Sequence, residues 1–239
     1  MHCACDDAGR AKIQHSGNLG EIGENMEKVQ VEKFKPGVRG THWIHSALII
    51  GFIITGYGIY TGNYIFGDQA QNLTLHMIMA FVILMDGLAH IYFMTVTGER
   101  HTIWMSWEDI RDIIKITKNF MGISKEYPEY ETYDVKAKKF HGKYHPVIKL
   151  KYFGDLWFLG FAVISGFGMY YSSVFDYVNS ILSPTGLGIN LIWLRWIHIM
   201  VFLYFFCILA IHVYLALIPV NRELLRSMIY GKEDVEVHK

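Results

Sequence analysis

Four long stretches of the chain are almost free of charged residues, and polar segments separate them. Each apolar stretch has about the 20 residues that a helix needs to cross the hydrocarbon core of a bilayer. Because these stretches are too long for ordinary core helices, the pattern predicts an all-α integral membrane four-helix bundle. The predicted spans cover about residues 42–62, 73–95, 154–175 and 193–218.

Basic residues are unevenly distributed among the segments that flank these spans. Six Lys and Arg residues precede the first span, eleven lie between the second and third, and four follow the fourth. The other two connections, which lie on the opposite side of the membrane, contain none. Arg195, at the start of the fourth span, is therefore the one basic residue on that side. By the positive-inside rule, both termini face the cytoplasm. We therefore expect cytoplasmic tails at 1–38 and 221–239 around a membrane domain at 39–220.

The long polar segment between the second and third spans contains a further predicted helix. Ser106 followed by Glu108 and Asp109 is typical of a capped helix start, and apolar residues then recur at helical spacing. Trp104 and Trp107 lie at its beginning, as expected at the level of lipid headgroups. We expect an amphipathic helix on the cytoplasmic membrane surface, with a helix docked on protein as the alternative.

Charge and cysteine content argue against other classes. The net charge is zero, so there is no electrostatic argument for a nucleic-acid partner. Residues 1–38 lack the apolar core of a secretory signal peptide, so we expect the N-terminus to stay in the compartment of synthesis. Cys3 and Cys5 lie beside His2, but no second ligand pair accompanies them, and a loose tail is favoured over a metal site.

Histidines interrupt three of the four apolar stretches. His198 and His212 in the fourth stand 14 residues apart, which places both rings on one helix face, about 21 Å apart along the axis. An unpartnered polar group in hydrocarbon costs several kcal/mol, so an intramembrane imidazole suggests a functional site. Two imidazoles at different depths on one face indicate two stacked redox cofactors.

The alternating direction of the spans sorts the histidines by depth. Spans two and four both run inward, so His76 and His198 lie near the outer face at one depth, as a bis-histidine haem requires. His212 lies near the inner face and needs a partner there. Three histidines are candidates by geometry: His42, His45 and His90.

Two arginines each precede one of these histidines by three residues. Arg39 precedes His42 and Arg195 precedes His198, so each pair shares a helix face. An arginine in this position can pair with a haem propionate through charge-assisted hydrogen bonds. A snorkelling arginine at the interface explains either one alone, but the two together favour haem.

At these positions the chain resembles a known family. The pattern R-x-x-H-W at 39–43, a histidine opening span two, and R-x-x-H followed 14 residues later by H-x-Y are similar to the di-haem cytochrome b subunits of membrane-bound nickel-iron hydrogenases. The chain is similar too to the gamma subunits of respiratory formate dehydrogenases. The Y-H-P-V-I-K-L-K-Y segment at 144–152 also resembles the family's lead into span three. The resemblance covers about residues 39–216.

The resemblance implies two haem b groups with histidine ligands. It favours His42 as the partner of His212 in the inner haem, beside the outer pair already described. His90 stands where such subunits often carry arginine, so it is assigned to a propionate, with inner-haem ligation as the alternative. Asp86, one turn before His90, is a candidate for proton delivery or for holding His90, with structural hydrogen bonding as the alternative. The implied axial ligands are His42, His76, His198 and His212.

The resemblance further implies a non-catalytic electron-transfer subunit of a respiratory complex in a prokaryotic cytoplasmic (inner) membrane. Electrons from peripheral iron-sulfur and catalytic subunits would enter at the outer haem and leave at the inner haem to a quinone-like lipid-soluble carrier. A quinone-reduction site would be its one contribution to chemistry, and we expect the complex to form higher-order oligomers. Two alternatives stay open: a stand-alone membrane cytochrome b that passes electrons from quinol to another acceptor, and a haem-free polytopic transporter.

Overall fold

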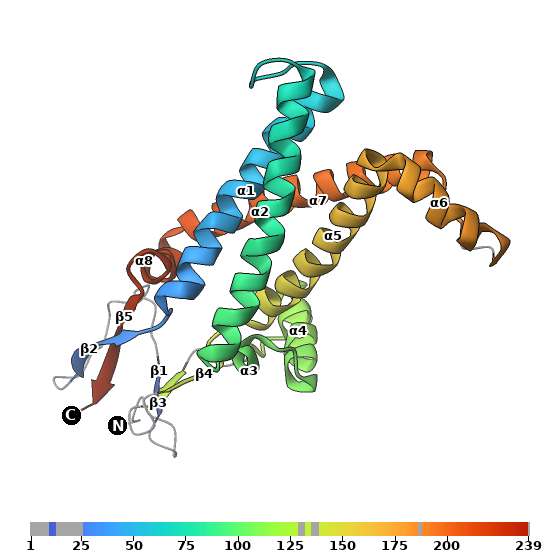
Figure 1. Cartoon of the computed structure of the whole chain (residues 1–239). Coiled ribbons are helices and arrows are strands. Elements are labelled where there is room, and N and C mark those ends of the chain that lie inside the picture. Colours follow the sequence, from blue (N-terminus) through green and yellow to red (C-terminus); the bar gives the residue numbers. More distant parts are fainter. Residues whose placement is uncertain (1–9, 13–25, 129–131, 135–138, 186–187, 239) are drawn as a thin grey trace. The chain divides into compact units, whose positions relative to one another are not determined.

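The computed structural model describes residues 10–12, 26–128, 132–134, 139–185 and 188–238, so Cys3 and Cys5 lie outside the described chain (Figure 1). Three of its helices are each long and apolar enough to cross a membrane, and a bent pair gives a fourth span if the pair is counted as one. The long apolar helices predicted from the residue pattern are therefore confirmed. They are α1 (Pro36–Thr61), α2 (Gln69–Val96), α7 (Leu191–Leu217) and the bent pair α5 (Pro146–Tyr170) with α6 (Ser172–Leu182).

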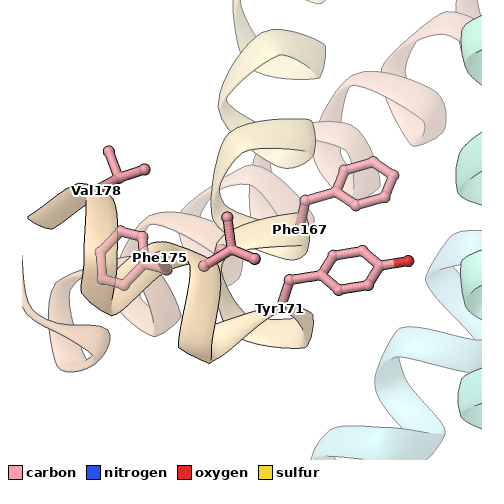
Figure 2. A pocket seen from close by; sticks show the side chains of 6 residues that line it. Phe167, Tyr171, Phe175 and Val178 are labelled. Carbon is pink, nitrogen blue, oxygen red and sulfur yellow. The ribbon is translucent and has the colours of Figure 1, made fainter.

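The third apolar stretch is bent and not straight. α5 ends at Tyr170, and α6 turns away from it by 108°. Gly168 allows close packing at this elbow, because a Cβ there would lie 2.8 Å from Cδ1 of Leu194 and 3.2 Å from Cδ2 of Phe175. An apolar hollow of about 330 Å³ lies at the elbow (Figure 2). It is lined by Phe167, Gly168, Tyr171, Val174, Phe175 and Val178.

The chain separates into two compact units. The first comprises Met1–Trp43, Gly87–Lys151 and Val213–Lys239, and the second comprises Ile44–Asp86 and Tyr152–His212. The long helices α1, α2, α5 and α7 each contribute residues to both units. Both histidines of the predicted outer pair belong to the second unit, whereas both ends of the chain belong to the first.

Two small antiparallel sheets occur in the first unit, formed by segments outside the long helices. β2 pairs with β5 along its whole length, and β3 lies between β1 and β4. Next to β2, the ammonium of Lys33 forms a buried ion pair of 2.9 Å with Glu233 of β5. This sheet joins segments from the two ends of the chain. The strands are β1 (Arg10–Lys12), β2 (Met26–Glu32), β3 (Thr132–Asp134), β4 (Lys139–His141) and β5 (Lys232–His238).

The predicted helix between the second and third apolar stretches is confirmed as α4 (Trp107–Phe120). Ser106 caps it, since its hydroxyl accepts from the backbone N–H of Asp109, whose carboxylate accepts from the backbone N–H of Ser106. Its apolar side is open: Trp107 is 80% and Phe120 92% exposed. The remaining helical segments are α3 (Arg100–Ile103), α8 (Arg222–Tyr230) and the 3-10 turns η1 (Ser183–Thr185) and η2 (Pro219–Asn221).

Candidate functional site

α1 and α2 pack side by side in opposite directions, and this packing positions the site. Gly51 of α1 allows the close approach, because a Cβ there would lie 2.6 Å from the sulfur of Met79 on α2. Asn72 of α2 is buried and donates from Nδ2 to the carbonyl oxygen of Thr55 on α1, at 2.9 Å. One turn beyond Asn72, His76 reaches the side chain of the same threonine. The helix pair therefore brings a hydroxyl of α1 to a histidine of α2.

The predicted outer pair, His76 on α2 and His198 on α7, is brought together. The two ring centroids lie 6.3 Å apart, with 60° between the ring planes. A metal bound between two imidazoles lies about 2 Å from each nitrogen, and each ring adds a radius of about 1 Å, so such a pair needs about 6 Å between ring centres. The observed spacing fits an iron held between the two rings.

A hydroxyl determines which ring nitrogen of His76 carries the proton. Thr55 Oγ1 lies 2.7 Å from His76 Nδ1 and 2.8 Å from the carbonyl oxygen of Gly51. The carbonyl can only accept and the hydroxyl has one proton, so both bonds form when the hydroxyl donates to the carbonyl and accepts from Nδ1–H. Nε2 of His76 then carries the lone pair that a metal requires.

His198 has the same arrangement with a residue of α5. Ser165 Oγ lies 2.9 Å from His198 Nδ1 and 2.5 Å from the carbonyl oxygen of Phe161. Gly166 lets the backbone approach the ring, because a Cβ there would lie 3.2 Å from Cε1 of His198. Both imidazoles are therefore held as Nδ1–H tautomers, and the residues present fit a bis-histidine haem.

His90 repeats the contact of His76. Thr41 Oγ1 lies 2.9 Å from His90 Nδ1 and 3.2 Å from the carbonyl oxygen of Gly37. Thr41 and Thr55 are 14 residues apart on α1, and so are His76 and His90 on α2. The hydroxyl–imidazole contact thus recurs after about four helical turns.

The other predicted residues of the inner level lie in varied surroundings. His45 Nδ1 is 3.4 Å from Oδ2 of Asp86, whose side chain is 4% exposed. The ring of His42 is partly buried and meets Trp43 edge-on, with centroids 5.5 Å apart. His212 is exposed on α7 and belongs to the second unit, whereas His42 belongs to the first.

The two arginines predicted to meet propionates differ in their contacts. Arg39 Nη1 donates to the carbonyl oxygen of Ile229, near the C-terminus of α8, at 2.6 Å. Trp43 Nε1 donates to the neighbouring carbonyl of Met228 at 3.3 Å. The Arg and Trp of the R-x-x-H-W motif therefore hold α8 against α1. Arg195 is exposed near the start of α7.

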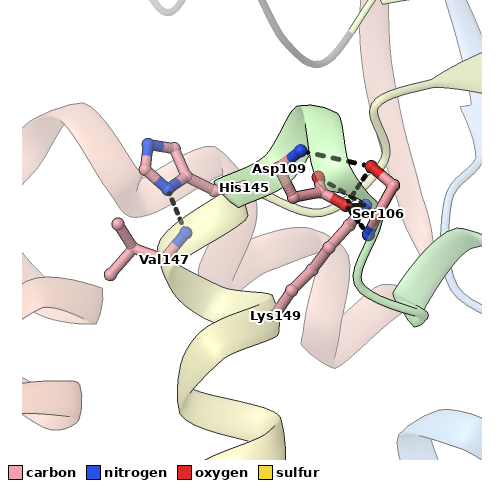
Figure 3. A network of polar contacts seen from close by, with 5 residues as sticks. All are labelled: Ser106, Asp109, His145, Val147 and Lys149. Atoms are coloured by element: carbon pink, nitrogen blue, oxygen red, sulfur yellow. Dashed lines mark hydrogen bonds and ion pairs between the residues drawn. The ribbon is translucent and has the colours of Figure 1, made fainter. Parts of the chain in front are cut away.

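The segment that leads into α5 links it to α4 (Figure 3). His145 Nδ1 accepts from the backbone N–H of Val147 at the start of α5, at 3.1 Å. Lys149 Nζ donates to both carboxylate oxygens of Asp109, at 2.8 and 3.0 Å. Burial acts to raise the pKa of Asp109, but hydrogen bonds from Lys149 and Ser106 outweigh it and hold that pKa below its usual value. The Y-H-P-V-I-K-L-K-Y segment, which resembles the family's lead into span three, thus has a structural role here.

Sequence reasoning missed the Thr and Ser residues that contact histidines of the apolar stretches, namely Thr41, Thr55 and Ser165, and one acid within α5. The repeated 14-residue spacing of the threonines was a signal for two of the hydroxyls. Asp155 accepts a hydrogen bond of 2.9 Å from the hydroxyl of Tyr204 on α7. Gly154 leaves room for this contact, because a Cβ there would lie 2.7 Å from that hydroxyl.

Comparison with known proteins identifies the class. The family model for prokaryotic cytochrome b561 matches residues 33–231, and the chain belongs to this family of membrane cytochromes. Membership implies that it binds haem b. A relative from Methanosarcina mazei, described as F420 non-reducing hydrogenase II cytochrome subunit, is 26% identical over 211 residues, which cover 79% of this chain and 77% of the relative. The predicted resemblance to hydrogenase-type cytochrome b subunits is thereby confirmed.

Proposed function

We propose that the chain is the b-type di-haem membrane-anchor subunit of a respiratory complex of the hydrogenase type. It carries electrons across the membrane between peripheral iron-sulfur and catalytic subunits and a quinone-like lipid-soluble carrier. The observation that carries the proposal is the facing pair of His76 and His198, 6.3 Å apart, each with its Nδ1 bonded to a hydroxyl. The description of the M. mazei relative supports a hydrogenase partner over a formate dehydrogenase.

In this proposal two pairs of histidines hold the haems, His76 with His198 on the outer side and His42 with His212 on the inner side. Haem b, when bound, supplies one-electron iron chemistry at each level. The chain's own residues hold the ligand rings and set the two levels about 21 Å apart along α7 by the 14-residue spacing of its histidines. The residues assigned to propionates are Arg195 on the outer side, and Arg39 and His90 on the inner side.

Asp86 is assigned to proton delivery toward the carrier. Reduction of a quinone-type carrier consumes two electrons and two protons, and the protons must reach it inside the membrane. The Asp86 carboxylate is buried in α2, with the imidazole of His45 at 3.4 Å. A carboxyl and an imidazole can share and pass on a proton without leaving an isolated charge in hydrocarbon. Re-protonation would come from the cytoplasmic side.

Haem content and partner content test the proposal together. We expect two haem b per chain in pyridine haemochrome and reduced-minus-oxidised spectra of the purified complex, and copurification of an untagged iron-sulfur subunit. His101→Ala is the control for the loss of a histidine that binds no haem. His101 is an exposed histidine of α3, and its replacement should leave the haem content unchanged. A colourless preparation, or one haem per chain, would contradict the di-haem assignment. Two haems without an iron-sulfur partner would instead favour the stand-alone cytochrome.

A further inference from the structure

Both histidines of the outer pair receive the same second contact from different helices. Thr55 on α1 serves His76 on α2, and Ser165 on α5 serves His198 on α7. Each hydroxyl also lies within hydrogen-bond distance of the carbonyl four residues earlier on its own helix. This intrahelical bond uses the hydroxyl's proton, so the oxygen presents a lone pair to Nδ1–H. Two independent helix pairs thus reach the same arrangement.

Both hydroxyl side chains are buried, which indicates that they serve the imidazoles and not solvent. Thr55 is 0% and Ser165 1% exposed. A valine or an alanine would fill such positions without burying a polar oxygen, whereas each of these oxygens has an imidazole as its partner. An imidazole without an acceptor at Nδ1 would be free to exchange tautomers, and its ring would be free to rotate about the Cβ–Cγ bond. The hydroxyls remove both freedoms and leave each Nε2 without a proton.

We propose that Thr55 and Ser165 are positioning residues for the outer haem iron, which hold His76 and His198 with Nε2 toward the metal and increase electron donation by both imidazoles. The inference rests on the proposed function, because it requires iron between the two rings. A hydrogen bond donated by Nδ1–H makes the imidazole a more basic ligand. A more basic ligand stabilises ferric over ferrous iron and lowers the reduction potential of the outer haem.

The experiment is a redox titration of the outer haem in the purified complex carrying Thr55→Val, Ser165→Ala or Thr55→Ser. Valine keeps the shape of threonine without the hydroxyl, and serine keeps the hydroxyl. In Thr55→Val and Ser165→Ala we expect the ratio of reduced to oxidised outer haem at a fixed ambient potential to rise by up to about tenfold, which is ~59 mV for a one-electron couple. Thr55→Ser should remain close to wild type. The largest EPR g value of the ferric outer haem, which depends on the angle between ligand planes, should change in the first two variants alone.

Two further hydroxyl variants serve as matched controls. Thr61 of α1 donates to the carbonyl of Tyr57 at 2.9 Å in the same intrahelical way but is exposed, so Thr61→Val should leave the outer haem unchanged. Thr41→Val removes the corresponding hydroxyl from His90 and should also leave the outer haem unchanged.

Each outcome decides between the inference and its alternatives. Wild-type potentials and EPR signals in both hydroxyl-free variants, with two haems bound, would overturn the inference and leave the proposed function standing. An equal shift in Thr61→Val would overturn it as well. Loss of the outer haem in Thr55→Val with retention in Thr55→Ser would support it, and if Thr55→Val does not fold, Ser165→Ala decides alone. A wild-type complex without haem would overturn the proposed function itself.

Discussion

Buried polar contacts within the apolar stretches and outside them use different chemistry. Around the outer histidines of the second unit they are neutral hydroxyl–imidazole bonds, made by Thr55 and Ser165. In the first unit, outside the apolar stretches, they include three buried ion pairs with N–O distances of 2.8–2.9 Å. The difference follows the medium, because a charge in hydrocarbon is costly whereas a hydroxyl and an imidazole satisfy each other without one. The ion pairs are Lys33–Glu233, Lys143–Glu99 and Lys149–Asp109.

Two carboxyl groups depart from this division, since they lie within the long helices of the second unit. Asp86 lies 3.4 Å from His45, and Asp155 accepts from the hydroxyl of Tyr204. In both contacts the partner is a group that can itself gain or lose a proton. An acid inside an apolar helix is a functional candidate by default. The comparison therefore separates residues that hold a site, residues that hold the fold and acids that can handle protons.

The largest effect should follow from removing one ligand of the neutral pair. His198→Ala leaves His76 facing a space with no second nitrogen, so the outer haem should be lost and the haem content should fall from two to one per chain. Pyridine haemochrome analysis with spectra at two ambient potentials would show which haem is missing. Retention of both haems with unchanged spectra would remove His198 from the ligand set.

The inner level can be examined by a matched pair of variants. His42→Ala should lose the inner haem, whereas His90→Ala should keep both haems and shift the potential of the inner one. His90, like His76, has a threonine hydroxyl at its Nδ1. It therefore has the surroundings of a ligand, and its variant is a strict test of the assignment. The number of haems per chain in the two purified variants shows which histidine is needed for the inner haem. Loss of the inner haem in His90→Ala and not in His42→Ala would reverse the assignment.

Asp86→Asn should slow reduction of the carrier by about a hundredfold, because the amide cannot donate the proton that the carboxyl passes on. Both haems should remain spectrally intact and be reduced by the electron donor at the normal rate. Stopped-flow measurement of haem reduction and of carrier reduction separates the two steps. Asp176→Asn on α6, an exposed acid, is the control. Unchanged carrier turnover would leave Asp86 with a structural role.

The long helices and the closeness of His76 to His198 could be predicted from sequence, for a physical reason. Apolar stretches of membrane length must form helices, and the alternating direction of the spans places His76 and His198 at one depth. The hydroxyls could not be assigned in this way. A Ser or Thr in an apolar helix commonly bonds to its own preceding turn, so Ser165 alone does not reveal that it also serves a histidine on another helix.

The pairing of β2 with β5 also could not be predicted from the sequence. Val29 and Val31 alternate with polar residues, and so do Val235 and Val237, which is the period of a strand. Nothing in either short segment indicates a partner near the other end of the chain. Such a pairing is settled by tertiary contacts, which include the buried pair of Lys33 with Glu233.

The smallest effect concerns the ion pairs. The pKa of Asp109 lies below its usual value, so its stabilisation is complete above the carboxyl's unfolded pKa of about 4 and is lost as the pH falls through the folded pKa. Lys149→Met should lower the free energy of unfolding by about 2 kcal/mol at neutral pH, the worth of a hydrogen-bonded charge pair, and should flatten the acid dependence.

Thermal unfolding of the detergent-solubilised protein from about pH 7 to about pH 3 measures both effects. The control is Lys115→Met, which removes an exposed pair with Asp112 and should cost well under about 1 kcal/mol. If Lys149→Met matches the wild type in stability and acid sensitivity, the pairing of Lys149 with Asp109 adds nothing to stability. The contrast between charged contacts outside the apolar stretches and neutral contacts within them would then describe solvation cost alone.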